Sequence, residues 1–77
     1  MKLSELKKVV AEYPSLILKE TDNSIIVCQK DSKNVGPWVG AISTVYNNSF
    51  QIYGWDNYDY RLFNAILLTG LTAIDER

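Results

Sequence analysis

The stretch SLILKETDNSIIVCQK, from Ser15 to Lys30, contains two runs of aliphatic and β-branched residues separated by Thr-Asp-Asn. Runs of this kind are typical of β-strands, and Asp22 and Asn23 are residue types that accept the backbone conformation of a tight hairpin turn. A two-residue turn at these positions places Leu18 opposite Val27. The more apolar face of this hairpin, which we expect to face the core, contains Leu16, Leu18, Ile25 and Val27.

A second pair of such runs, PWVGAISTVY and SFQIYG, flanks Asn47 and Asn48. The same reasoning predicts a two-residue turn with both asparagines at positive φ and with Val45 opposite Phe50. The face that we expect to lie in the core contains Val39, Ala41, Ser43, Val45, Phe50 and Ile52. The opposite face, which we expect to meet solvent or a partner, contains Trp38, Gly40, Ile42, Thr44, Tyr46, Ser49, Gln51 and Tyr53.

Apolar residues at helical spacing flank these four strands on both sides. The N-terminal stripe contains Leu3, Leu6, Val9, Val10 and Tyr13. Pro14 ends this helix near Glu12, because the residue before a proline disfavours helical dihedrals. The C-terminal stripe contains Tyr60, Phe63, Leu67, Leu71 and Ile74. We expect Asp56 or Asn57 to cap this helix, and Gly70 within it indicates close packing against a neighbour.

The order of elements is therefore helix, four antiparallel strands and helix. This pattern predicts a single α+β domain over residues 1–77, built from two layers. In this fold a four-stranded antiparallel meander carries the N-terminal and C-terminal helices on one face.

The composition excludes several classes of function. The 77 residues have a formal net charge of −1, which gives no electrostatic basis for binding a nucleic acid duplex. No segment has the roughly 18 apolar residues of a membrane span or the pattern of a signal peptide, so we expect a cytoplasmic protein with no membrane partner. The chain has no histidine, one cysteine and no glycine-rich phosphate motif, so we expect no metal, no cofactor and no internal disulfide.

Two groups of residues could carry catalysis. Cys28 would be a nucleophile only beside an activating base or positive charge, and a lone strand cysteine is more often a small apolar residue. Asp56 and Asp59 offer two carboxylates, but helix capping explains acidic residues at a helix start more simply. We therefore predict no catalytic residues.

The scarcity of charge is the feature that points to a function. No residue between Asn34 and Trp55 is charged, and after Arg61 the next charge is Asp75. A helix on the surface of so small a domain normally has a charged outer stripe. We therefore predict a dimer interface on the back of the C-terminal helix, formed by Leu62, Ala65, Thr69 and Ala73. We also predict a partner- or ligand-binding face formed by Trp38, Tyr46, Tyr53 and Trp55.

These patterns favour a non-enzymatic domain that forms a homodimer and binds another protein. The alternative is an aromatic platform for a sugar or single-stranded nucleic acid, although the lack of Lys and Arg near the aromatic residues disfavours nucleic acid. A third reading is a small enzyme that uses Cys28, or Asp56 with Asp59. The length and layout are similar to those of many small proteins of bacteriophages and prophages, but no motif indicates a named family.

Overall fold

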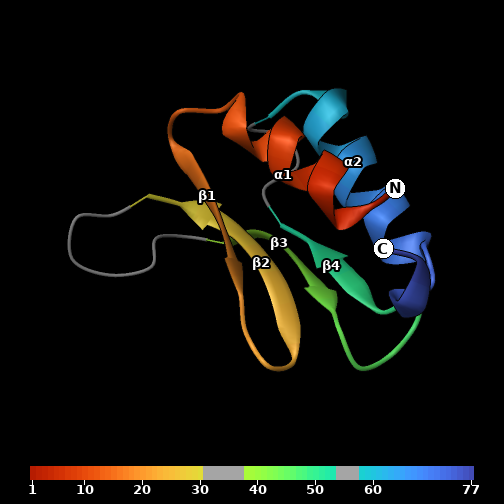
Figure 1. Cartoon of the computed structure of the whole chain (residues 1–77). Coiled ribbons are helices and arrows are strands. Elements are labelled where there is room, and N and C mark those ends of the chain that lie inside the picture. The colour runs from red at the N-terminus through yellow and green to blue at the C-terminus, as the bar shows by residue number, and fades with distance from the viewer. Residues whose placement is uncertain (31–37, 54–57) are drawn as a thin grey trace.

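The computed structural model describes residues 1–30, 38–53 and 58–77. Its elements follow the predicted order, as Figure 1 shows. They are α1 (Leu3–Ala11), β1 (Leu16–Glu20), β2 (Ser24–Gln29), β3 (Trp38–Ser43), β4 (Phe50–Ile52), α2 (Tyr60–Leu71) and the 3-10 helix η2 (Ile74–Glu76).

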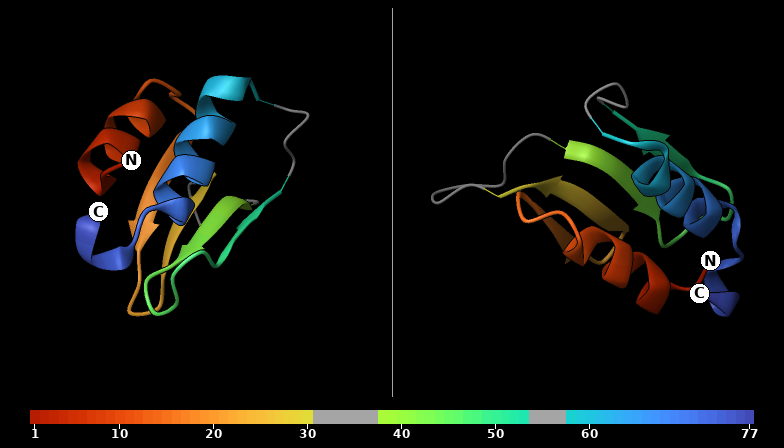
Figure 2. Two further views of the ribbon diagram at one scale, coloured as in Figure 1. Left: turned by 90° about the vertical axis from the view of Figure 1, so that its right-hand side faces the viewer. Right: turned by 90° about the horizontal axis from the view of Figure 1, so that it is seen from above.

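The four strands form one antiparallel sheet in the order β1-β2-β3-β4, and both α-helices lie on one face of it (Figure 2). α1 contacts β1, α2 contacts β3 and β4, and the two helices contact each other. The predicted two-layer α+β fold is therefore confirmed. The core between the layers contains Leu6, Val9, Val10, Leu16, Ile25, Val27, Val39, Ile42, Leu62, Ala65 and Ile66.

The first hairpin has the predicted register. Leu18 pairs with Val27, and the N–H of Thr21 donates to the carbonyl of Ser24 at 2.8 Å, which closes the turn. The Thr21 hydroxyl also accepts the N–H of Ser24 at 3.0 Å. The side chains of the predicted core face either are buried or pack against the core.

The second hairpin has a different register from the predicted one. Ile42 pairs with Phe50, and the N–H of Ser43 donates to the carbonyl of Ser49 at 2.8 Å, so a longer loop replaces the two-residue turn. The pairing changes by an odd number of residues, which turns β3 over relative to β4. As a result Ile42 is buried in the core and Ala41 lies on the outer face, whereas β4 keeps its predicted core side. The residues of β3 whose predicted face was wrong are Gly40, Ala41, Ile42 and Ser43.

Hydrogen bonds at the start of the loop explain why the two-residue turn does not form. The Ser43 hydroxyl accepts the N–H groups of Val45 and Tyr46 at 3.1 and 2.9 Å. The N–H of Thr44 donates to the carbonyl of Asn23, in the turn of the first hairpin, at 2.9 Å. These bonds bend the chain directly after β3, so Val45 is 53% exposed rather than in the core.

The C-terminal segment also holds this loop. Asn47 accepts the N–H of Ile74 through its side-chain oxygen at 2.9 Å, and the Arg77 guanidinium donates to the carbonyl of Ser43 at 2.7 Å. Arg77 also donates to three carbonyls at the end of α2, where a positive charge is favourable. Asn48 alone among the described non-glycine residues has positive φ, at 59°, so the prediction for Asn47 was wrong.

A β-bulge in β3 separates Trp38 from the core. Val27 pairs with Gly40, but the next residue, Cys28, pairs with Trp38, so Val39 is an extra residue in the ladder. The bulge lets Val39 enter the core while Trp38 stays on the outer face. The predicted faces of both residues are therefore correct, although the register that led to them was not.

The N-cap of α2 and the side of the helix that is buried both differ from the prediction. Its N-cap is Asp59, whose carboxylate accepts the N–H of Leu62 at 3.3 Å; the predicted caps, Asp56 and Asn57, lie outside the described residues. The buried face contains Leu62, Ala65, Ile66, Thr69 and Gly70. A Cβ on Gly70 would lie only 2.5 Å from the Phe50 ring, so small residues on this face let the helix approach the sheet.

The face assignment also corrects the predicted dimer interface. Leu62, Ala65 and Thr69 are at most 1% exposed within the chain's own core, and the Thr69 hydroxyl donates to the Ala65 carbonyl at 2.7 Å. Ala73 is half-buried just after the helix. Leu62, Ala65 and Thr69 are therefore not accessible to a second copy in this structure. The spacing of these small residues did not distinguish the two possibilities, because small residues suit both a close helix–sheet contact and a close helix–helix contact.

Candidate functional site

The outer face of the sheet is the candidate site. Both helices lie on the other face, and no described segment forms a third layer over it (Figure 2). The side chains that β3, β4 and the adjoining residues place on this face are Trp38, Ala41, Ser43, Ser49, Gln51 and Tyr53. They are all uncharged, so this half of the face can meet an apolar or neutral polar surface without desolvating an ion.

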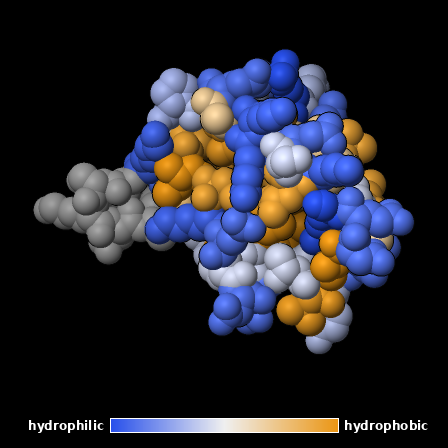
Figure 3. Space-filling model, in the orientation of Figure 1, coloured by the Kyte–Doolittle hydropathy of each residue, from blue (hydrophilic) through white to orange (hydrophobic). Residues whose placement is uncertain are grey.

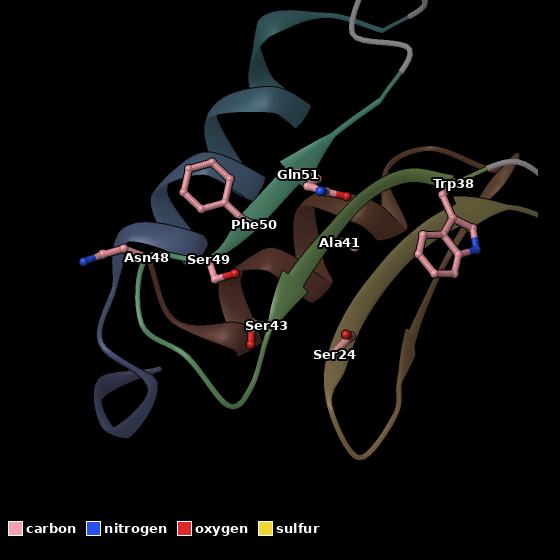
Figure 4. A pocket seen from close by; sticks show the side chains of 8 residues that line it. All are labelled: Ser24, Trp38, Ala41, Ser43, Asn48, Ser49, Phe50 and Gln51. Carbon is pink, nitrogen blue, oxygen red and sulfur yellow. The ribbon is translucent and has the colours of Figure 1, made fainter.

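A shallow, open depression of about 440 Å³ lies on this face (Figure 4). Trp38 stands at one end of it and Asn48 at the other. The residues that line it are Ser24, Trp38, Ala41, Ser43, Asn48, Ser49, Phe50 and Gln51. Its polar groups are hydroxyls and amides, which both donate and accept hydrogen bonds without carrying charge. Such a lining suits a neutral polar ligand or the backbone of another protein.

The structure brings together only part of the predicted aromatic site. Trp38 is 46% exposed and Tyr53 is 41% exposed, and both lie at the same end of the β3–β4 pair, since Tyr53 N–H donates to the carbonyl of Val39. Tyr46, 71% exposed, lies in the loop beyond the other end of β3, roughly 20 Å of strand away from Trp38. Trp55 lies outside the described residues.

Two buried residues on the outer face of β2 were not predicted as part of this site. Ile26 is 8% and Cys28 is 0% exposed although both point to the outer face, where Cys28 lies between Ile17 and Trp38 on the neighbouring strands. Burial raises the pKa of the Cys28 thiol, and the positive charge of Lys19 opposes this only in part. The unbroken apolar run Ile25, Ile26, Val27 and Cys28 is the sequence signal that side chains on both faces of β2 are buried.

The Asp59 carboxylate is engaged in holding the two helices together. It accepts hydrogen bonds from the Tyr13 hydroxyl and from the N–H of Leu62. The bond from Tyr13 is the main cause that lowers the pKa of Asp59, while burial, and then this bond, raises the pKa of Tyr13 to about 12. Asp56, its predicted catalytic companion, lies outside the described residues. The geometry around Asp59 is that of a helix cap joined to α1.

A second depression, between α1 and β1, has a different character. Its lining includes Lys7 and Glu20, whose side chains form an ion pair at 3.3 Å, and also Lys30. Figure 3 shows the apolar surface near these elements broken up by hydrophilic side chains. A partner that covered this depression would have to desolvate these charges, which makes the outer face of β3 and β4 the better candidate.

The described residues contain no cluster of His, Cys, Asp and Glu side chains able to hold a metal ion. Neither described α-helix is long and apolar enough to cross a membrane. Comparison of the chain with protein-family models, with curated proteins and with solved structures finds no match. The chemistry of the chain's own surface is therefore the basis for assigning a function.

Proposed function

We propose that the chain is a non-enzymatic interaction domain that binds another protein through the outer face of its sheet. The observation that carries this proposal is an uncovered sheet face without charge on β3 and β4, on which Trp38 and Tyr53 are both half-exposed. Tryptophan and tyrosine are the residue types that most often dominate the energy of protein interfaces. The proposal includes a cytoplasmic location, a homodimer and an accessory role of the kind that small phage and prophage proteins have.

Site-specific photo-crosslinking tests the binding face. A photoreactive residue in place of Tyr53 should crosslink to one protein of the source cell, and the crosslink should be lost when Trp38→Ala is added. A photoreactive residue in place of Tyr60, which is 78% exposed on α2, is the matched control and should not give this product. Equal labelling from both positions, or none from Tyr53, would contradict the proposal.

A sugar ligand is the second candidate. The depression beside Trp38 has hydroxyl and amide side chains and no charge, and the flat faces of sugar rings stack on tryptophan. Titration with neutral oligosaccharides, followed by NMR shifts of the Trp38 indole and the Gln51 amide, separates this candidate from protein binding. Single-stranded nucleic acid is disfavoured because β3 and β4 supply no Lys or Arg to pair with phosphates.

Catalysis by Cys28 or Asp59 is not part of the proposal. The buried thiol with its raised pKa is a poor nucleophile, and Asp59 already caps α2. Alkylation by iodoacetamide tests this point. Cys28 in the folded protein should react far more slowly than in the unfolded chain. Rapid labelling of Cys28 in the folded protein would support the hypothesis that Cys28 is a catalytic nucleophile.

A further inference from the structure

The outer edge of the sheet, at β4, exposes backbone groups that can pair with another strand. Ser43 N–H donates to the Ser49 carbonyl, and Tyr53 N–H donates to the Val39 carbonyl at 2.6 Å. In an antiparallel ladder the residues between such pairs direct their N–H and C=O groups away from the neighbour. Phe50 and Ile52 are in this position, and no hydrogen bond joins their outward groups to any described segment.

This edge lacks the features that normally prevent strands from pairing. Natural edges are usually protected by charged side chains, proline or a covering segment. The opposite edge follows this rule, because β1 carries Lys19 and Glu20, and Glu20 pairs with Lys7 of α1. From Ser49 to Tyr53 the β4 edge has neither a charge nor a proline.

An apolar flank of α2 continues the same surface. Gly70 faces Phe50, and Arg61 bonds to Glu12, the C-cap of α1, so these contacts fix the rotation of the helix about its axis. With 3.6 residues per turn, Leu67 and Leu71 project on the side of β4, away from α1. Leu71 is 53% exposed, and the helix carries no charge after Arg61.

We infer that two copies of the chain meet on this surface, with β4 antiparallel to β4 of the second copy and with the α2 flanks in contact. The inference rests on the homodimer included in the proposed function and specifies how it forms. The register with most hydrogen bonds pairs Phe50 of each copy with Ile52 of the other, which places Gln51 on the two-fold axis. A surface without charge can face itself without repulsion, so a second copy is the occupant that fits.

The size of the surface predicts the strength of the dimer. The ladder from Ser49 to Tyr53 is about 17 Å long, and the sheet edge and helix together span roughly 20 Å in the other direction. A patch with these two dimensions has a smaller area than the roughly 800 Å² per partner of a standard interface. We therefore expect a dimer that dissociates at micromolar concentrations.

Sedimentation velocity from about 10 to about 500 µM is the test, with circular dichroism to verify that each variant is folded. Gln51→Lys and Gln51→Glu should each weaken the dimer by up to about fivefold, because like charges then face each other across the axis. An equimolar mixture of the two variants should restore association. Leu71→Lys should also weaken the dimer, whereas Trp38→Ala should not.

Two outcomes would overturn the inference in distinguishable ways. A wild-type chain that stays monomeric at the highest concentration removes both the homodimer and this surface. A dimer that Trp38→Ala weakens and Leu71→Lys leaves unchanged keeps the homodimer and moves it to the outer face. Hydrogen exchange gives an independent readout, since the Phe50 and Ile52 amides should become protected as the concentration rises.

Discussion

The two hairpins differ in where their register is determined. In the β1–β2 hairpin, the turn closes through Thr21 and Ser24, and these bonds lie within the segment that they shape. In the β3–β4 hairpin, the Ser43 hydroxyl bends the loop locally. The loop is also held from outside, by Asn23 of the first hairpin and by Ile74 and Arg77 near the C-terminus. A register determined by local contacts alone can be read from a short stretch, whereas one that also depends on distant contacts cannot.

Replacement of the core residue of β3 gives the largest test of this difference. Ile42→Ala should lower the free energy of unfolding by about 3 kcal/mol, because Ile42 is 1% exposed and its loss leaves a cavity. Ala41→Ser, on the outer face, should change stability by less than about 0.5 kcal/mol. Urea unfolding measures both. A larger loss of stability from Ala41→Ser than from Ile42→Ala would support the two-residue turn instead of the observed loop.

The contact between α2 and β4 gives the next largest effect. Gly70→Ala gains about 1 kcal/mol of helix propensity but brings a methyl group 2.5 Å from the Phe50 ring. Because overpacking costs about 1–3 kcal/mol, we expect a net loss of up to about 2 kcal/mol. Phe50→Leu should recover part of this loss when combined with Gly70→Ala. A stabilised Gly70→Ala variant, measured by thermal unfolding, would show that the helix does not approach β4 so closely.

The two asparagines of the second loop form a matched pair. Asn47→Gly removes the side-chain oxygen that accepts the N–H of Ile74 and should cost about 1 kcal/mol. Asn48→Gly should change stability by less than about 0.5 kcal/mol, because glycine readily adopts the φ of 59° at this position. A two-residue turn would make both variants behave alike, so equal melting temperatures would contradict the observed loop.

The smallest expected effect concerns the pH dependence at the junction of the helices. The pKa of Asp59 is lowered in the folded chain, so its contribution is present above pH 4 or so and is lost as the pH falls through the folded value. Asp59→Asn keeps a capping residue but not the charge. The advantage of the wild type over this variant, measured by thermal unfolding between about pH 6 and pH 3, should therefore shrink on acidification. A constant difference would count against a charged Asp59 in the cap.

The layer architecture was predictable because it depends on patterns that tolerate errors of register. The alternation of Leu16, Leu18, Ile25 and Val27 and the N-terminal helical stripe were sufficient for the first hairpin and α1. The face of α2 was not predictable from periodicity, since both sides of the helix are apolar. The burial of Leu62 and Ile66 and the contact of Gly70 with Phe50 show which side faces the sheet.

The candidate site was predictable in composition but not in geometry. Trp38 and Tyr53 share the outer face as expected. Trp38 lies there because of a β-bulge at Val39, which cannot be predicted from the length of a hairpin turn. Tyr46 does not lie beside Trp38 and Tyr53, because the Ser43 hydroxyl accepts its N–H and bends the chain after β3. Hydroxyl-to-backbone bonds of this kind compete with ladder pairing and are not visible in hydrophobic patterning.

The contacts that hold the loop between β3 and β4 also affect the order in which the chain folds. The bond between Asn47 and Ile74 spans 27 residues, so it can form only after α2 has docked on the sheet. Closing long segments is slower than closing short ones, which favours early formation of the β1–β2 hairpin. We therefore expect the second hairpin to be the last part of the sheet to reach its native register.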